Sequence, residues 1–259
     1  MVSPLGLDRD TTWDNLLKGV SGVDQITTFD TEGFATTIAA EVKGFEPEAY
    51  VGRKLARRMD RFVQLAAAAT FEAVEDAGVK VDPANGHRVS VMIASGIGGI
   101  MTLSREHEVL LERGPSRVNP FLVPMMLPDM ASGQVSMLFG AKGPNYSTVS
   151  ACSSAADTLG QAYEAILRGD VDMVLAGGAE AAICPIGIAG FNSCQALSKR
   201  NDEPQKASRP FDAQRDGFVL GEGAAVLVLE SMESAEDRGA TPVAEMIGYG
   251  STADAYHIT

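Results

Sequence analysis

The chain has 259 residues, of which 45% are hydrophobic and 21% charged, a composition typical of a folded domain and not of a disordered chain. It contains no apolar run long enough to span a membrane and no secretory signal pattern at its start, so we expect a cytoplasmic protein. A net charge of −13 disfavours general binding to nucleic acid or to anionic membranes, because like charges repel.

The N-terminal segment contains a turn, Val2-Ser3-Pro4-Leu5-Gly6, of the kind that follows a strand. Almost nothing precedes this turn, and residues 253–259 carry no terminating signal, so we expect a fragment that is incomplete at both ends. A helix is expected to start at Thr11-Thr12-Trp13-Asp14, which has capping chemistry.

A basic cluster stands out against the acidic composition: Arg53, Lys54, Arg57, Arg58 and Arg61. The last four would share one helix face if a helix begins before residue 59. A run of charges is usually a solvated face. In an acidic chain, however, concentrated positive charge favours a docking site for an acidic partner.

Helix-type and strand-type segments alternate through the rest of the chain. Buried strands are expected at residues 89–94 and 171–176, with amphipathic helices at 59–77, closed by Gly78, and at 152–167. Later strands are expected at 218–230 and 243–249, joined by a short helix at 233–238. Such alternation requires crossover connections and predicts an α/β layered sheet.

Glycines follow the first of these strands, in Gly96-Ile97-Gly98-Gly99. They do not form a dinucleotide fingerprint, because Met101 stands where that pattern needs a third glycine or an alanine. We expect them to permit close packing instead.

Cys152 lies where an extended run meets the helix expected over residues 152–167. The free N–H groups and the dipole at a helix N-terminus stabilise a thiolate, and the Cys152 N–H is suited to donate to an oxyanion. A free cysteine is usually a small buried hydrophobe, and we assign that role to Cys184 and Cys194. With no Cys-x-x-Cys pair, we expect reduced thiols and no metal site.

No histidine is an evident proton-handling partner for this cysteine. We interpret His87, in a Gly/Pro-rich turn, and His107, in a charged helix, as solvated surface residues. His257 stands alone in the C-terminal segment, and a lone histidine is more often structural than catalytic.

The stretch Val149-Ser150-Ala151-Cys152-Ser153-Ser154-Ala155 resembles the nucleophile motif of the β-ketoacyl-acyl-carrier-protein synthases, in particular the type II synthases that elongate fatty acyl chains. Further stretches match the family on both sides of this motif, in the same order as in the family: residues 94–99, 119–124, 176–180, 207–212, 215–223 and 254–259. The resemblance implies the thiolase-like α/β layered fold, with a mixed five-stranded sheet covered by helices. It further implies that residues 1–259 are the N-terminal domain of such an enzyme and that the C-terminal half is missing.

A ping-pong Claisen condensation is the chemistry that the resemblance implies. An acyl group would pass from carrier-protein phosphopantetheine to Cys152, and malonyl carrier protein would lose CO₂ to give the carbanion that attacks the acyl-cysteine. The family's two histidine motifs, Asn-Ala-His-Gly-Thr and Gly-His-x-x-Gly-Ala, do not occur in this sequence. We therefore expect that this chain alone does not condense, even if Cys152 is acylated.

Further positions match the family residue by residue. Ile97 and Phe191 match residues of the acyl pocket, and Thr259 matches one at the pantetheine channel. Lys54, Arg57 and Arg58 match the helix that docks the acyl carrier protein, in agreement with the charge argument. Arg117 matches a second basic patch, in which Ser116 and Gln195 replace basic residues. The resemblance also implies a homodimer, with a strand at residues 145–150 near its interface, and neither a metal nor a dissociable cofactor.

Two alternatives to a fatty acid condensing enzyme remain open. A polyketide ketosynthase uses the same cysteine chemistry on other carrier proteins. A non-catalytic chain is the second alternative, either a chain-length-factor-like partner or a fragment that only docks carriers. Cys152 counts against the chain-length factor, because those proteins replace the nucleophile.

Overall fold

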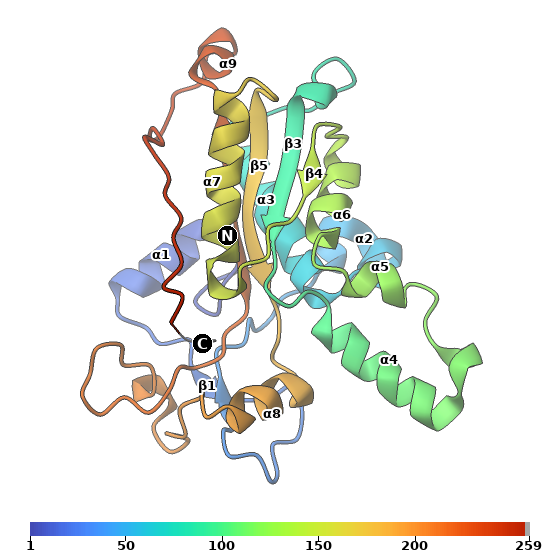
Figure 1. The fold of residues 1–259 in the computed structure, drawn as a ribbon, viewed down its shortest axis with the longest axis vertical. Coiled ribbons are helices and arrows are strands. Elements are labelled where there is room, and N and C mark those ends of the chain that lie inside the picture. The colour runs from blue at the N-terminus through green and yellow to red at the C-terminus, as the bar shows by residue number, and fades with distance from the viewer. Residues whose placement is uncertain (257–259) are drawn as a thin grey trace.

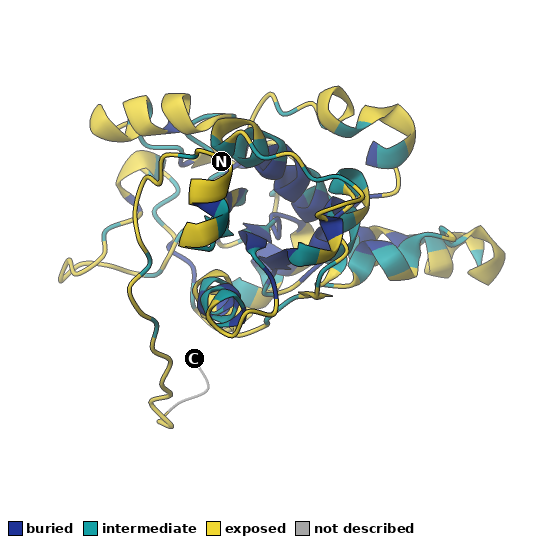
Figure 2. Ribbon diagram, turned by 90° about the horizontal axis from the view of Figure 1, so that it is seen from above, coloured by how far each residue is buried: buried dark blue, intermediate teal, exposed yellow. Residues whose placement is uncertain are grey.

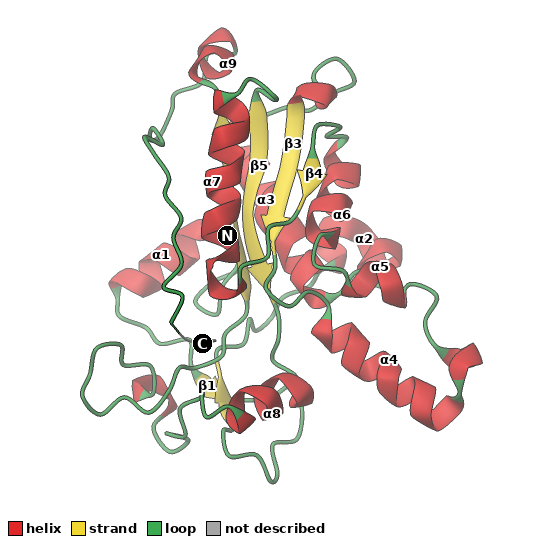
Figure 3. Cartoon of the chain, in the orientation of Figure 1, coloured by secondary structure: helices red, strands yellow, loops and turns green. Residues whose placement is uncertain are grey.

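A mixed four-stranded sheet lies at the centre of the computed structural model, which describes residues 1–256 (Figure 1). The strands are β3 Val89–Ala94, β4 Asn145–Tyr146, β5 Met173–Glu180 and β6 Gly223–Glu230. Their order is β4-β3-β5-β6, with β3 parallel to β4 and β5, and β6 antiparallel to β5. A separate antiparallel pair, β1 Asp24–Gln25 and β2 Ile38–Ala39, lies in the loop-rich part of the molecule (Figure 3).

Helices cover both faces of the sheet. α3 (Arg61–Ala77) and α6 (Met130–Phe139) pack on one face, and α7 (Ser154–Leu167) packs on the other (Figure 1). The other α-helices of the described residues are α1 Arg9–Leu17, α2 Glu48–Ala56, α4 Ile100–Arg113, α5 Leu122–Met126, α8 Pro185–Ser193 and α9 Met232–Asp237. The expected α/β layered fold is confirmed.

Side chains of the central strands alternate between two apolar clusters. Val91 and Ile93 of β3 belong to the cluster that includes α3 and α6, whereas Met92 packs with Ala162 and Ala165 of α7. Alternation is the consequence of the pleat, and burial on both faces explains why β3 reads as an unbroken apolar run. Figure 2 shows the buried residues gathered in the middle of the molecule, with exposed residues around them.

The sheet has four strands over residues 1–256, and not the five expected. On the outer side of β6 the described residues form a single bridge, between Val2 and Ala224, and not a strand. The expected strand at 145–150 is also shorter: only Asn145 and Tyr146 pair with β3.

Glycines let β5 run further than the hydrophobic pattern predicts, as far as Glu180. A Cβ at Gly177 would lie 2.0 Å from the Ala225 carbonyl oxygen of β6, and a Cβ at Gly178 would lie 2.6 Å from the Ala155 Cβ of α7. Both neighbours therefore approach the β5 backbone at a distance that only glycine allows.

The expected strand at 243–249 is wrong for the described structure. No strand is assigned there, and Val243 and Ile247 are 99% and 87% exposed. An apolar, β-type sequence forms a strand only where a partner pairs with it. The expected strand at 218–230 begins later, at Gly223, whereas the short helix near 233–238 is confirmed as α9.

Candidate active site

Cys152 lies exposed in a 3₁₀ turn, Ala151–Ser153, directly before α7. The helix therefore begins at Ser154 and not at Cys152. Ala151 has φ 52°, an uncommon conformation for a residue with a side chain. The Ser154 hydroxyl accepts from the Ser150 N–H at 2.9 Å and donates to the Ala151 carbonyl at 2.7 Å, which fixes both ends of the turn.

The turn after β3 meets the Cys152 turn at the carboxyl edge of the parallel strands. A Cβ at Gly96 would lie 3.2 Å from the Ala151 carbonyl oxygen, and a Cβ at Gly99 would lie 2.1 Å from the Met125 carbonyl oxygen. The glycines thus serve close packing, as expected, and bring the 95–99 turn against the backbone that carries Cys152.

Glu180, the last residue of β5, holds the 95–99 turn in this position. Its carboxylate accepts from the Ser95 hydroxyl at 2.9 Å and from the Gly96 N–H at 2.8 Å, and the Gly98 N–H donates to Ser95 Oγ at 2.8 Å. Burial raises the pKa of Glu180, and these hydrogen bonds act in the opposite direction. Glu180 lies in the family-matching stretch 176–180, but the sequence carries no local signal for its role, because its partners Ser95 and Gly96 follow a different strand, β3.

Asp157, in the first turn of α7, connects the Cys152 turn to the segment after α9. It accepts hydrogen bonds from the hydroxyls of Ser150 and Tyr249, and the Ser150 bond is the main cause of its lowered pKa. The sequence carries no local signal for this contact, since Tyr249 lies 92 residues beyond Asp157 and in a segment predicted to be a strand.

Of the three residues matched to substrate binding, Ile97 and Phe191 lie within the described part of the chain, and they do not belong to the same apolar cluster. Ile97 is 39% exposed on the 95–99 turn. Phe191, on α8, contacts the Phe218 ring edge to face, with 5.3 Å between the ring centres. In the described part of the chain, Phe191 packs in an apolar cluster that includes Ile100 but not Ile97. Thr259 and His257 lie outside the described residues.

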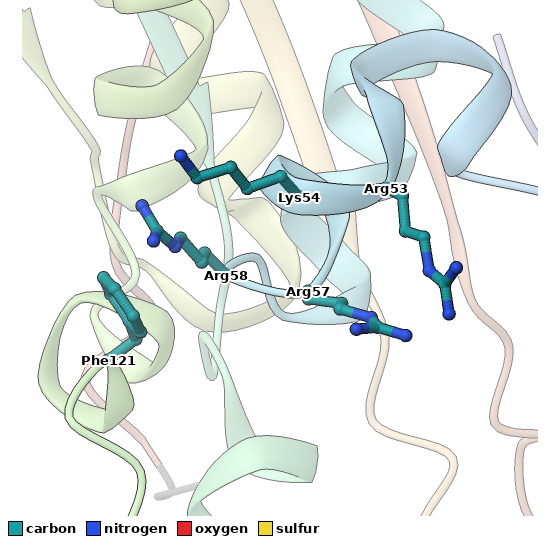
Figure 4. A pocket seen from close by; sticks show the side chains of 5 residues that line it. All are labelled: Arg53, Lys54, Arg57, Arg58 and Phe121. Atoms are coloured by element: carbon teal, nitrogen blue, oxygen red, sulfur yellow. The ribbon is translucent and has the colours of Figure 1, made fainter.

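Four of the five cations of the basic cluster border an open cavity of about 600 Å³: Arg53, Lys54, Arg57 and Arg58, together with Phe121 (Figure 4). The Arg58 guanidinium lies 4.4 Å from the centre of the Phe121 ring, and Arg53 and Arg57 point away from that ring. Arg117 lies in the 3₁₀ turn Pro115–Arg117 and is not among the lining residues.

Arg61 does not belong to this basic surface, so the single helix face predicted for the cluster is wrong. α2 ends at Ala56 and α3 begins at Arg61, with the Asp60 side chain capping it. The Arg61 guanidinium instead pairs with the buried Glu222 at 2.7 Å.

Of the remaining candidates, Cys184 is buried as expected, and burial raises its pKa. Cys194 is exposed, so its assignment as a packing residue is wrong; it lies at the C-terminal end of α8. His87 and His107 are exposed, as expected. Over residues 1–256 no cluster of His, Cys, Asp or Glu is arranged to hold a metal, and no helix has the length and apolarity to cross a membrane.

Solved structures that are similar to this chain include ketosynthases. A beta-ketoacyl synthase from Burkholderia phymatum has a TM-score of 0.90 at 38% identity, covering all of this chain and 64% of the other. A ketosynthase in complex with its type II PKS acyl-carrier protein, bound to the hexaketide, has a TM-score of 0.84 at 32% identity, covering all of this chain and 62% of the other.

Sequence comparison agrees with the structural one. The family model described as "Beta-ketoacyl synthase, N-terminal domain" matches residues 1–235, and the chain belongs to the β-ketoacyl synthase family. A 3-oxoacyl-[acyl-carrier-protein] synthase 2 of Staphylococcus aureus is 52% identical over 258 residues, which cover all of this chain. The chain spans 64% of the length of that relative.

Proposed function

We propose that Cys152 is the nucleophile that accepts the acyl group in a condensing enzyme of fatty acid elongation. One observation carries the proposal: an exposed cysteine in a tight turn at the N-terminus of a fourteen-residue helix, α7. The helix N-terminus favours the thiolate, and the turn leaves the thiolate accessible.

Acyl transfer needs only a few groups from this chain. The Cys152 thiolate attacks the thioester carbonyl of an acyl carrier protein, the Cys152 N–H donates to the resulting oxyanion, and the pantetheine thiolate leaves as the acyl-cysteine forms. Loss of CO₂ from malonyl carrier protein then gives a carbanion, which attacks the acyl-cysteine and releases a chain two carbons longer and the free Cys152 thiolate.

The second half-reaction needs groups that this chain lacks. Neither histidine motif implied by the resemblance occurs in the sequence. We therefore propose that residues 1–259 are an N-terminal thiolase-like domain, which accepts the acyl group but does not condense alone. The length of the Staphylococcus aureus relative supports a larger complete enzyme.

The relative's printed name supports elongation on an acyl carrier protein. Polyketide synthesis is the second candidate, because a type II PKS ketosynthase shares the fold. It is less favoured, since the identity is 32% for that ketosynthase and 52% for the synthase 2 relative.

An acyl carrier protein is the partner we propose for the basic surface, defined as Arg53, Lys54, Arg57 and Arg58. The complex between a similar ketosynthase and its acyl-carrier protein supports this proposal. We assign carrier contact to Arg117 as well.

We further assign the acyl pocket to Ile97 and Phe191, and the pantetheine channel to Thr259. Replacing Ile97 with Ala should change the lengths of the acyl chains that Cys152 accepts. An unchanged length preference would show that Ile97 does not line the acyl pocket.

We further propose a homodimer joined near β4, because β4 is the outer strand of the sheet and its outer edge has no partner strand within residues 1–256.

We also propose a cytoplasmic location, because a free thiol nucleophile persists in a reducing compartment. Fractionation of cells that produce the chain tests this location.

Mass spectrometry of the chain incubated with acyl-loaded carrier protein tests the proposed nucleophile. We expect one acyl group per chain, located on Cys152 after digestion, and no acyl group on the Cys152→Ala variant. The matched control is Cys194→Ser, which removes another exposed thiol and should be acylated normally. An acyl group that persists on Cys152→Ala would refute the assignment.

A further inference from the structure

One carboxylate joins two segments that lie far apart in the sequence. The Ser150 hydroxyl donates to Asp157 Oδ2, and the Tyr249 hydroxyl donates to Asp157 Oδ1. The Ser251 hydroxyl lies 3.4 Å from the same Oδ1. Asp157 thus faces the turn that carries Cys152 on one side and the segment after α9 on the other.

The bond to Ser150 fixes the backbone that leads into Cys152. Ser150 is held twice, through its hydroxyl by Asp157 and through its N–H by Ser154 at 2.9 Å. Ala151, at φ 52°, follows it directly. A residue in this region needs support from its surroundings, and the direction of the Cys152 N–H depends on that support.

The segment after α9 contacts α7 through a notch at Gly160. A Cβ at Gly160 would lie 2.3 Å from the Tyr249 ring, so the ring rests directly on the helix backbone. Figure 1 shows this segment, in red, running alongside α7. The ring contact and the hydroxyl bond together place Tyr249 against Asp157.

The hydrogen bonds described for Asp157 indicate a structural role. Hydroxyl donors hold the pKa of this carboxyl below its usual range, so it is an anion at neutral pH and a strong acceptor. These donors are the hydroxyls of Ser150, Tyr249 and Ser251, and the Cys152 thiol is not among them. What Asp157 supplies is therefore geometry, through hydroxyls that it holds in fixed directions.

We infer that Asp157 is a positioning residue, which holds Ser150 so that the Cys152 N–H points at the oxyanion formed during acyl transfer. This inference rests on the proposed function of Cys152. It goes beyond that function by assigning acyl-transfer geometry to a contact between α7 and residues 249–251.

The test compares two reactions of Cys152 in the 259-residue chain. Acylation by a small acyl thioester forms an oxyanion, whereas alkylation by iodoacetamide needs only the thiolate. We expect Asp157→Ala and Ser150→Ala to slow acylation about 10-fold to 100-fold, the range for a misplaced reacting group, with alkylation nearly unchanged. Asp170→Ala, at the other end of α7, is the matched control and should affect neither rate.

The possible outcomes separate this inference from the function on which it rests. If both variants react like the wild type, or lose both reactions by the same factor, Asp157 does not position the turn, while Cys152 remains the acyl acceptor. If the wild type is alkylated but takes no acyl group, the proposed function fails and the inference fails with it.

Discussion

Arg58 is the cation of the basic surface whose position is best defined, because its guanidinium stacks on Phe121. We predict that Arg58→Glu weakens binding of an acidic acyl carrier protein about 10-fold or more, since it replaces attraction with repulsion. The effect should shrink as salt is added, because exposed charges are screened. Titration of labelled carrier protein at two salt concentrations measures both effects.

Lys80→Glu is the control for this change, since Lys80 is exposed in the loop beyond the other end of α3 and changes the net charge equally. Equal weakening by the two variants would mean that net charge, and not the basic surface, governs the encounter.

Single residues of the site divide into those with a local signal and those without one. The place of Cys152 at the start of α7 is predictable, because the junction of an extended run and a helix is visible in the sequence. The contacts of Phe121, Glu180 and Asp157 are not predictable in this way. Each of these contacts needs a partner residue that is distant in the sequence and is brought close by the fold. The local hydrophobic periodicity of a segment does not indicate such a partner.

At the scale of elements, the ion pair of Arg61 and Glu222 joins the start of α3 to the segment before β6. The Glu222 side chain is 2% exposed, and Arg61 also donates to the Val42 carbonyl at 2.8 Å. We predict that Arg61→Ala lowers the free energy of unfolding by about 3 kcal/mol, because it leaves a buried carboxylate unpaired. Urea denaturation measures this loss.

A double variant, Arg61→Met with Glu222→Leu, should recover part of the loss, because no buried charge remains. Lys43→Ala, which breaks an exposed pair with Asp24, should change stability little. If Arg61→Ala lowered the free energy of unfolding no more than Lys43→Ala does, the buried pair would contribute no more to stability than an exposed pair.

Elements with strong hydrophobic periodicity are predicted well. The errors occur where tertiary contacts determine the bounds of a helix or strand. β3 matches its predicted bounds, and α3 ends at Ala77 with Gly78 in the left-handed conformation, as the pattern indicates. The helix face predicted through Arg61 fails because Asp60 caps a new helix. β5 extends past its apolar run because glycines admit its neighbours.

At the scale of the whole molecule, apolar residues are exposed beside the outer strand β4. Met137 of α6 is 67% exposed and Val149, after β4, is 56% exposed. If the chain forms a homodimer there, Met137→Glu and Val149→Glu should each shift the sedimentation of the wild-type dimer towards that of a monomer, because the contact would bury a charge.

Val243→Glu adds the same charge at a residue that is 99% exposed in the segment after α9, and it should leave the dimer intact. Sedimentation of the wild type as a monomer, or of the Val149→Glu variant as an unchanged dimer, would contradict an interface near β4.

The layered architecture follows from the sequence because helices and strands alternate along it, whereas the number of strands does not. A strand needs a neighbour, and the outer side of β6 has only the bridge to Val2 within residues 1–256. The same requirement explains why residues 243–249 are apolar and yet form no strand there.

The ion pair of Arg61 with Glu222 can form only late in the synthesis of the chain. The two residues are 161 positions apart, and at ~5–20 residues per second a ribosome needs roughly 8–30 s to cover that distance. The parallel strands β3, β4 and β5 all emerge before Glu222. Only 43 residues separate the end of β5 at Glu180 from the start of β6 at Gly223, so the edge of β5 that later pairs with β6 is open to other nascent chains for roughly 2–9 s at that rate. Because Glu222 is made at the end of this interval, Arg61→Ala should act after the exposure of the edge and not during it.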